Sequence, residues 1–408
     1  MPRRNRPRSS RVHAGIAAMC VLLTVGAVGA VGVAVSLANN VEVAAPERVP
    51  ELEAEPESDL GAELESELES ELVPGPTTEA DTELDPAATE HDPAENAPDS
   101  ARSVGPPAVD EVEAAPAQRG RLVVHHVGDV NLDPDYLPTL DTLGYDAVWD
   151  GVRDTFAQAD LVLANLECAP TRGGVPQPKQ FVFRCELDAL PAMREAGVDV
   201  VSLANNHSGD YGIPAMVEGV GNVEAAGIVA VGVGADEVEA YTPRLVEVAG
   251  WRIAILGFGG VVPEPFWTAR GDLPGQATGY DPARMAEAVA LARDDADLVI
   301  ATVHWGTEGA LEPRQEDVVK AEAMIAAGAD VVFGHHAHRL QPLEEVDGAP
   351  VFWNLGNFVW PRLSQAGATT AVAEWIVDPD GTVTACLLPA EIDDRGVPAP
   401  TGAPRECW

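Results

Sequence analysis

Short apolar runs alternate with longer amphipathic segments over residues 121–333, and apolar runs dominate the remainder of the chain. The short runs have the length and flanking glycines of buried strands, whereas the longer segments repeat apolar residues at helical spacing. We predict strands at 121–127, 161–164, 198–203, 228–233, 245–248, 252–258, 298–303, 331–333, 342–346, 351–354, 370–377 and 382–389. We predict helices at 141–160, 187–196, 213–226, 281–293 and 313–327. This order indicates an α/β domain with a mostly parallel sheet, followed by an antiparallel extension or a second sheet.

The chain before residue 121 has a different pattern. Residues 14–38 form an uncharged and mostly apolar run, with five arginines before it and acidic residues after it. A membrane-spanning helix needs about 20 such residues, and the positive-inside rule places the preceding arginines in the cytoplasm. We therefore predict a basic cytoplasmic segment at 1–13 and a transmembrane signal-anchor at 14–38, which makes a single-pass cell-membrane protein with an extracellular domain. The alternative is cleavage after Ala38 and secretion, because Ser36-Leu37-Ala38 resembles a processing site.

The segment that follows is strongly acidic. Between residues 41 and 120 the chain carries 23 acidic residues and three arginines, with many prolines and an ESEL repeat. Such a composition cannot bury enough apolar surface to offset the loss of chain entropy. We predict a disordered linker at 39–120 and a single folded domain at 121–408. The predicted domain is itself acidic, with 43 acidic and 17 basic residues, which argues against a nucleic-acid partner.

Four of the five cysteines lie in the predicted domain, at positions 168, 185, 386 and 407. An even number of cysteines in an exported domain indicates disulfides. Four cysteines allow three pairings, and nearness in sequence favours Cys168 with Cys185 and Cys386 with Cys407.

Metal-ligand residue types follow one predicted strand after another. They are Asp129, Glu167, the pair Asn206-His207, His304, and a cluster of His335, His336 and His338. Because parallel strands place their carboxyl ends along one edge of a sheet, we expect these side chains to converge. Carboxylate, amide and imidazole groups together suit Mn, Fe or Zn, and two such ions bridged by a carboxylate activate water for phosphoester hydrolysis.

Six stretches of the chain carry a family resemblance: VGDVNL, NLE, SLANNHSGDYG, VHWGTE, AAGADVVFGHHAHRLQP and NLGNFVW. They resemble, in the same order, the CapA family of bacterial capsule-synthesis proteins, which includes poly-γ-glutamate capsule components. That family is in turn similar to calcineurin-like metallophosphoesterases. The resemblance implies a four-layer α/β/β/α sandwich with a site for two divalent metal ions.

The resemblance also implies roles for single residues. The implied metal ligands are Asp129, Glu167 in place of a bridging aspartate, Asn206, His304, His336 and His338. The chain departs from the superfamily at Asn131, where a histidine is usual, and at the closing motif, where an extra histidine leaves His335 or His336 as the ligand. His207 or His304 would protonate the leaving group or hold the phosphate. Five further residues lie in family motifs and either shape the substrate pocket or pack: Asn131, Asn205, Tyr211, Glu308 and Asn357.

Three hypotheses of function follow from these observations. The first is a membrane-anchored component of the synthesis or attachment of capsule, poly-γ-glutamate or another envelope polymer, acting at the outer surface on the polymer or its precursor. By resemblance, its partners would be a polymer-synthesis ligase and small membrane subunits. The second is a metal-dependent phosphoesterase, which is compatible with the first. The third is a degenerate module that binds a polymer without hydrolysing it.

Overall fold

The computed structural model describes residues 118–408. The predicted basic segment, the signal-anchor and nearly all of the predicted linker lie outside the described residues. Within residues 118–408, none of the helices combines the length and the apolar character needed to cross a bilayer.

Most of the strands belong to two mixed sheets. The first has nine strands and runs in the order β16-β15-β14-β1-β2-β3-β4, with β13 paired to β1 and β17 paired to β15. Its strands β1 to β4 are parallel, whereas β14 and β15 are antiparallel to their neighbours. The bounds are β1 (Leu122–Val130), β2 (Leu161–Leu166), β3 (Val200–Ser202), β4 (Val229–Val231), β13 (Asn357–Val359), β14 (Thr369–Val377), β15 (Val383–Ile392), β16 (Pro398–Pro400) and β17 (Glu406–Cys407).

The second sheet has six strands in the order β11-β12-β10-β9-β7-β6. The four central strands are parallel, and the edge strands β6 and β11 are antiparallel. A separate two-stranded sheet joins β5 and β8. The bounds are β5 (Val233–Gly234), β6 (Arg244–Val248), β7 (Trp251–Gly259), β8 (Gly275–Gln276), β9 (Leu298–His304), β10 (Val331–His335), β11 (Leu343–Val346) and β12 (Ala349–Phe352). The sequence pattern alone predicted one mostly parallel sheet, whereas the parallel strands are divided between two sheets. Two sheets agree with the α/β/β/α arrangement that the family resemblance implies.

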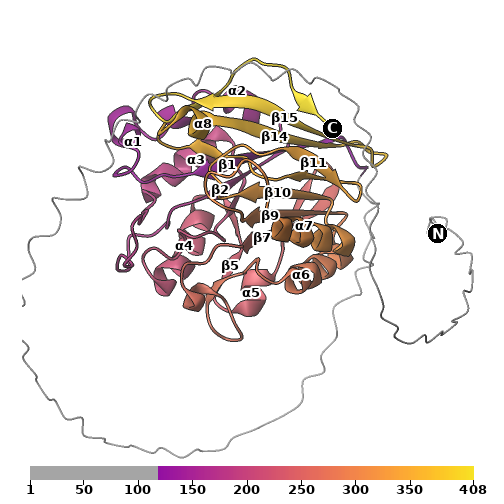
Figure 1. The fold of residues 1–408 in the computed structure, drawn as a ribbon, viewed down its shortest axis with the longest axis horizontal. Helices are drawn as coiled ribbons and strands as arrows, with labels where there is room; N and C mark the ends of the chain where they lie inside the picture. The colour runs from indigo at the N-terminus through magenta and orange to yellow at the C-terminus, as the bar shows by residue number, and fades with distance from the viewer. Residues whose placement is uncertain (1–117) are drawn as a thin grey trace, which may run out of the picture. The chain divides into compact units, whose positions relative to one another are not determined.

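Helices cover the outer face of each sheet. The α-helices are α1 (Thr139–Leu143), α2 (Arg153–Phe156), α3 (Leu190–Ala196), α4 (Ile213–Ala225), α5 (Glu237–Tyr241), α6 (Pro282–Asp295), α7 (Gln315–Ala327) and α8 (Gln365–Ala368). The 3-10 helices are η1 (Ala147–Trp149), η2 (Leu187–Ala189) and η3 (Pro265–Trp267). Helices α1 to α4 pack on the first sheet, and α5, α6 and α7 pack on the second, where Figure 1 shows α6 and α7 side by side.

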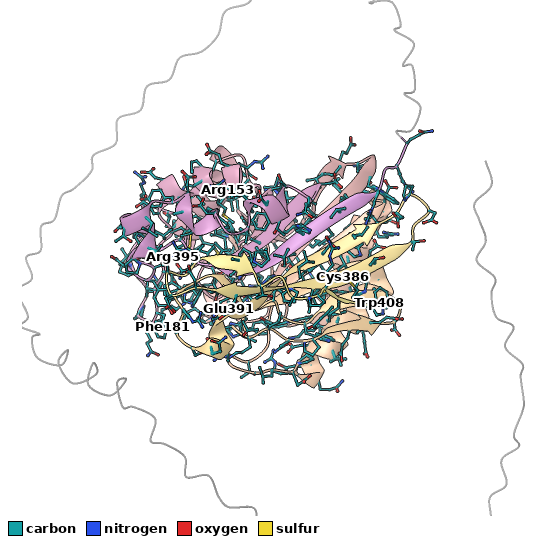
Figure 2. All side chains as sticks on the ribbon, turned by 90° about the horizontal axis from the view of Figure 1, so that it is seen from above. Arg153, Phe181, Cys386, Glu391, Arg395 and Trp408 are labelled. Atoms are coloured by element: carbon teal, nitrogen blue, oxygen red, sulfur yellow. A yellow bond between two sulfur atoms is a disulfide. The ribbon has the colours of Figure 1, made fainter. Side chains whose placement is uncertain are left out.

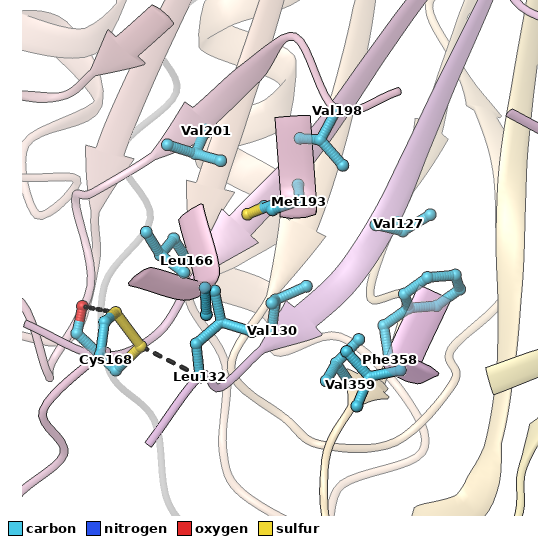
Figure 3. Close-up of a cluster of buried hydrophobic side chains, with 14 of the residues drawn as sticks. Val127, Val130, Leu132, Leu166, Cys168, Met193, Val198, Val201, Phe358 and Val359 are labelled. Atoms are coloured by element: carbon cyan, nitrogen blue, oxygen red, sulfur yellow. Dashed lines mark hydrogen bonds between the residues drawn. A yellow bond between two sulfur atoms is a disulfide. The ribbon is translucent and has the colours of Figure 1, made fainter. Parts of the chain in front are cut away.

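Three buried clusters hold these layers together. One lies between α1 to α4 and the first sheet, where Figure 3 shows Met193 of α3 among Val130 and Leu166. A second lies between the two sheets, and a third lies between the second sheet and its helices. In β9, Leu298 and Ile300 face the other sheet while the alternate residues face the helices. Because both faces are buried, the strand reads as one continuous apolar run.

The prediction of one helix over 141–160 is wrong, because two glycines interrupt it. Helix α1 ends at Gly144, whose φ of 87° lies in the left-handed region. A Cβ at Gly151 would lie 2.3 Å from the carbonyl oxygen of Pro398, so the backbones of two distant segments meet there. The apolar spacing across this stretch is helical, but the chain divides it into α1, η1 and α2.

The other helices and the predicted hairpin are present. Helix α3 ends at Gly197 in a left-handed cap, and α6 begins at Asp281, whose side chain accepts a hydrogen bond from the backbone of Ala283. Strands β6 and β7 form the hairpin through Ala249 and Gly250, which both have positive φ as a tight hairpin turn requires.

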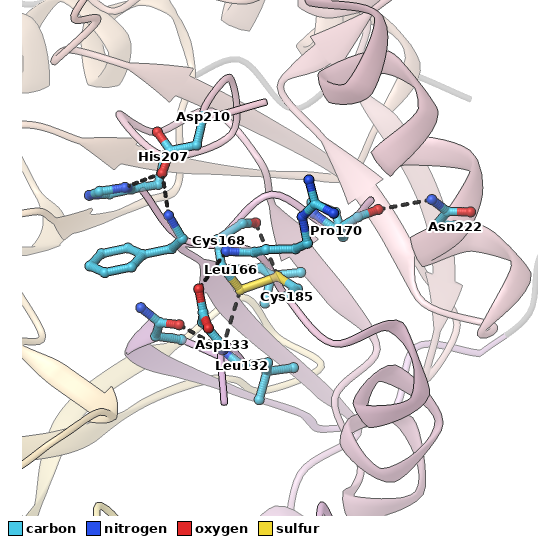
Figure 4. The surroundings of a disulfide bond; sticks show 12 residues. Leu132, Asp133, Leu166, Cys168, Pro170, Cys185, His207, Asp210 and Asn222 are labelled. Atoms are coloured by element: carbon cyan, nitrogen blue, oxygen red, sulfur yellow. Dashed lines mark hydrogen bonds and ion pairs between the residues drawn. A yellow bond between two sulfur atoms is a disulfide. The ribbon is translucent and has the colours of Figure 1, made fainter. Parts of the chain in front are cut away.

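Both predicted disulfides are present, between Cys168 and Cys185 and between Cys386 and Cys407. The first lies directly after β2 and is shown with its surroundings in Figure 4. The second joins β15 to β17, and Figure 2 shows Cys386 near Trp408 on the yellow C-terminal strands.

Candidate metal centre

The ends of strands from both sheets meet at one point of the described domain. Asp129 lies in β1, Glu167 follows β2, and Asn206 follows β3, so the first sheet supplies three groups. The second sheet supplies His304 as the last residue of β9 and the turn that follows β10. The predicted convergence is thus observed, but it is formed by two packed sheets rather than by one edge.

A first group of donors consists of Glu167, His304 and His336, whose ligand atoms all lie within 4.8 Å of one another. His304 Nε2 is 3.4 Å from Glu167 Oε1 and 3.1 Å from His336 Nδ1. The carboxamide oxygen of Asn206 lies 2.7 Å from the same His304 nitrogen. Two imidazoles, a carboxylate and an amide oxygen therefore surround one small volume.

A second group consists of Asp129, Glu167 and His338, again within 4.8 Å. His338 Nδ1 lies 3.1 Å from Asp129 Oδ2, and His338 Nε2 lies 3.9 Å from Glu167 Oε1. Glu167 belongs to both groups, and its Oε1 faces both His304 and His338. Glu167 is therefore the residue that the two donor groups share.

The protonation properties of the two carboxylates fit a cation site. Burial raises the pKa of Glu167 well above its usual range, and the neighbouring Asp129 and Glu308 raise it further. Burial alone would also raise the pKa of Asp129, but the neighbouring imidazoles of His335 and His338 hold it well below its usual range. Asp129 Oδ2 and Glu167 Oε1 are buried and make no hydrogen bond within the described residues. Buried carboxylate oxygens of this kind are compensated by a pairing charge or a metal, so the donor set fits divalent ions.

Two asparagine side chains, Asn165 and Asn205, form hydrogen bonds next to the donor groups. Asn165 Nδ2 donates to Asp129 Oδ1 at 2.9 Å and lies 3.2 Å from His304 Nδ1. Asn205 Nδ2 donates to Asn165 Oδ1 at 3.1 Å and to the Leu166 carbonyl at 2.8 Å. Of the two roles considered for Asn205, shaping the substrate pocket or packing, these contacts within the protein favour packing. The role of Asn165 was missed, because an asparagine after a strand usually indicates a turn.

The turn after β10 settles which histidines face the ligand groups. His336 and His338 have φ values of 88° and 52°, a strained conformation that costs about 1–3 kcal/mol per residue and is concentrated at functional sites. His335 is not in either donor group: its Nδ1 lies 3.4 Å from Asp129 Oδ1 and its ring packs 4.8 Å from His126. Of the two residues left open by the sequence, the structure therefore brings His336 rather than His335 to Glu167.

Asn357 orients one of these histidines. Its Oδ1 lies 2.8 Å from His338 Nδ1, and its Nδ2 donates to the Gly367 carbonyl at 3.1 Å. A second partner of this kind fixes the ring of a ligating histidine. Asn357 therefore contacts a residue of the second donor group.

His207 lies beside the donor groups and is held by Asp210. The distance from His207 Nδ1 to Asp210 Oδ2 is 2.7 Å, and Asp210 is fully buried. Burial lowers the pKa of His207, while the bond to Asp210 opposes that shift. Asp210 was not predicted, although it lies three residues after His207 within the same motif.

The remaining predicted residues do not belong to either donor group. Asn131 accepts a hydrogen bond from the backbone of Asp133 at 2.9 Å. The guanidinium of Arg184 lies 3.7 Å over the ring of Tyr211. Glu308 is exposed, and its negative charge contributes to the raised pKa of Glu167.

Comparison with known proteins identifies relatives of this chain. The PGA biosynthesis protein CapA of Bacillus subtilis (strain 168) is 28% identical over 282 residues, which cover 68% of this chain and 73% of that protein. The capsule biosynthesis protein CapA of Bacillus anthracis is 27% identical over 288 residues, or 69% of each chain. A probable polyglutamine synthesis accessory protein of Mycobacterium tuberculosis (strain ATCC 25618 / H37Rv) is 34% identical over 211 residues, which cover 49% of this chain and 55% of that protein.

Among solved structures, a putative 5'-nucleotidase from Staphylococcus aureus, in complex with alpha-ketoglutarate, matches with a TM-score of 0.45 and 14% identity. The match covers 67% of this chain and 55% of that one. The model of the family described as "Bacterial capsule synthesis protein PGA_cap" matches residues 123–362, which is more than half of the chain and contains every residue of both donor groups. The chain belongs to this family of bacterial capsule synthesis proteins.

Proposed function

We propose that the protein takes part in the biosynthesis of capsule, poly-γ-glutamate or another envelope polymer, and that it carries a dinuclear metal site of the metallophosphoesterase type. The names of the relatives support the first part, since two are biosynthesis proteins for capsule or PGA and one is a probable accessory protein of polyglutamine synthesis. The donor groups support the second part.

One observation carries the metal proposal: Glu167 is shared by two groups of donors. The first metal would be held by Glu167, Asn206, His304 and His336, and the second by Asp129, Glu167 and His338. This mixture of imidazole, carboxylate and amide favours Mn, Fe or Zn over Ca or Mg. When bound, such ions supply Lewis acidity at phosphoryl oxygens and lower the pKa of water.

Side chains next to the two donor groups would have different roles in catalysis. His207, oriented by Asp210, would hold the phosphate or donate a proton to the leaving-group oxygen. The ring of Phe183 packs 4.2 Å from His207, and the ring of Trp360 packs 4.8 Å from His338. These rings restrict water on one side of the centre, which strengthens its electrostatic interactions.

The location and the partners are proposed from the sequence. The apolar run at 14–38 would anchor the protein in the cell membrane, and the acidic linker would carry the domain on the extracellular side. There it would meet the polymer or its precursor, a polymer-synthesis ligase and small membrane subunits. An intact N-terminus in the membrane fraction is the expected result. A mature protein that begins at Asn39 and is found in the medium would show instead that the segment is a cleaved signal.

A metal analysis and an activity screen test the site. Full-length protein should bind up to two ions of Mn, Fe or Zn per chain and hydrolyse a phosphomonoester or phosphodiester with Mn added. Glu167→Gln should lose metal and activity, whereas Glu322→Gln, on the exposed face of α7, should lose neither. Wild-type protein without metal would refute the dinuclear site.

A second candidate function is binding of a polymer without hydrolysis. Asn131 favours it, because this residue stands where the superfamily has a histidine and its carboxamide oxygen is bound to the backbone of Asp133. Protein that binds metal but hydrolyses nothing in the screen would support this candidate over the phosphoesterase.

A further inference from the structure

A disulfide-closed segment, residues 168–185, leaves the candidate site directly after Glu167 and returns to it; we call it the strap. Its two ends are joined by the Cys168–Cys185 disulfide and by hydrogen bonds between Ala169 and Phe183 and between Cys185 and Ala169, each 3.0 Å long. Its middle is bonded to the loop after β3, since the backbone of Gln177 donates to the Asp210 carbonyl at 2.8 Å. Figure 4 shows the disulfide together with His207 and Asp210. The strap is therefore fixed at both its base and its middle.

The strap places one ammonium group at the edge of the candidate metal centre. Lys179 Nζ donates to Asp210 Oδ1 and to the Asn206 carbonyl, both at 2.6 Å, and lies 3.3 Å from His207 Nδ1. The same nitrogen lies 5.5 Å from the centre of the Trp267 ring, where a cation is attracted by the π electrons. The Lys179 side chain is only 20% exposed, so these contacts replace much of its hydration.

Asp210 connects this lysine to His207. Its side chain is fully buried, its Oδ1 accepts from Lys179, and its Oδ2 accepts from the backbone of Phe183 at 2.7 Å and faces His207 Nδ1 at 2.7 Å. A carboxylate with these donors acts only as an acceptor, so the hydrogen of the His207 ring belongs on Nδ1 and Nε2 is left free. A buried carboxylate without a cation is costly, and Lys179 is the cation that offsets this cost.

We propose that Lys179 is a positioning residue: it keeps Asp210 as a hydrogen-bond acceptor, and Asp210 in turn keeps His207 in one ring orientation and one tautomer. The proposal rests on the proposed function only for the task it gives to His207. Lys179 acts through Asp210 and not by binding substrate. Loss of the lysine should therefore change the state of the His207 ring while the metal ligands stay in place.

The strap itself supplies a matched control. Arg172 is a second strap cation, but its guanidinium is 62% exposed and pairs with Asp188 at 2.8 Å and Glu186 at 3.4 Å on the surface. Removing this charge alters the strap without touching Asp210. Lys179→Met, Lys179→Arg and Arg172→Met thus separate a specific effect on His207 from a general effect on the strap.

The first test does not depend on activity. Full-length protein with nitrogen-15 in its histidine rings and Zn²⁺ added would be studied by NMR, with the His207 signals assigned by their loss in His207→Gln. Wild type, Lys179→Arg and Arg172→Met should each show one His207 tautomer with hydrogen on Nδ1, whereas Lys179→Met should show a mixture. If Lys179→Met does not fold, Lys179→Gln replaces it. A His207 pattern in the lysine variant that is identical to wild type would overturn the proposal.

The second test applies to hydrolysis of the phosphoester found in the screen. Lys179→Met should lower kcat at least about tenfold, since general acid–base catalysis contributes on the order of a hundredfold or more, with KM and metal content unchanged. On an Asp210→Asn background the same change should have little further effect. A raised KM at constant kcat would place Lys179 on the substrate and overturn the proposal. If wild type is inactive, the phosphoesterase function fails, and the NMR result alone decides the role of Lys179.

Discussion

The two disulfides close loops of similar length at different places, which allows stability to be separated from support of the candidate site. We consider Cys168→Ala with Cys185→Ala, and Cys386→Ala with Cys407→Ala. The paired cysteines are 17 and 21 residues apart. The loop-entropy relation gives roughly 3 kcal/mol for either loop, which corresponds to a fall in Tm of roughly 5 °C for a domain of this size.

Loss of the Cys168–Cys185 disulfide should lower the free energy of unfolding by more than the loop-entropy contribution alone. Cys168 and Cys185 are both buried, and the backbone of Leu132 donates to Cys168 Sγ at 3.3 Å. Truncation to alanine leaves a small cavity and removes this acceptor, which adds about 1–2 kcal/mol. In the second pair Cys386 is also buried but Cys407 is exposed, so this additional loss should be smaller.

Metal affinity should distinguish the two variants more strongly than stability. Cys168 directly follows Glu167, and the strap that it closes is bonded through the backbone of Gln177 to the Asp210 carbonyl, in the loop that also carries Asn206. Loss of support behind a ligand typically costs about 10- to 100-fold in metal affinity, so we expect at least about a tenfold loss for the first pair and none for the second. Urea unfolding would measure stability, and competition with a chelating dye would measure affinity. Equal affinities in the two variants and wild type would refute the idea that the strap supports the ligands.

Three further predictions concern the centre and the strands that form it. His336→Ala should remove about one metal ion per chain while leaving the fold intact, because it deletes one donor of the first group. Glu65→Ala, in the predicted linker, should remove none, and metal analysis of both variants tests this. Gly128→Ala should destabilise the protein by about 2–4 kcal/mol, because a Cβ there would lie 2.0 Å from the carbonyl oxygen of Gly356. Gly221→Ala is the control: it lies within α4 with open space around it, and it should instead stabilise the protein by about 0.5–1 kcal/mol. An unchanged urea midpoint for Gly128→Ala would contradict the close approach of Gly128 to the Gly356 carbonyl. In metal-free protein, burial lowers the pKa of His336 from 6.5 to about 4, so the unfolded chain binds more protons and stability should fall as the pH drops from 6.5 towards 4; equal urea midpoints at pH 7 and pH 5 would contradict this.

Local patterns in the sequence were sufficient for most elements. The period of the apolar residues and the glycines at their ends located β9, α3 and α6, because these signals depend on neighbours within one segment. The stretch 141–160 is the exception. Its apolar spacing is helical, but α1 ends at Gly144, and Gly151 lies against the backbone of Pro398, a neighbour that is remote in sequence.

The sequence also determined which chemical groups the centre contains. Carboxylate, amide and imidazole residues after successive strands indicated a metal site, and the order of the motifs indicated the family. The family resemblance implied two sheets, but the pattern of each strand did not show to which sheet it belongs. Strands with both faces buried have similar apolar sequences, so the residues of β2 and β9 do not indicate that these strands belong to different sheets.

Only the tertiary structure decided how the residues of the centre share their tasks. His335 and His336 are neighbours in sequence, yet the positive φ of His336 turns one imidazole towards Glu167 while the other lies against Asp129. Lys179 reaches Asp210 only because the strap folds back over the loop after β3. Residue type and spacing are properties of the sequence, whereas the direction of a side chain depends on backbone angles and on contacts between segments that are distant along the chain.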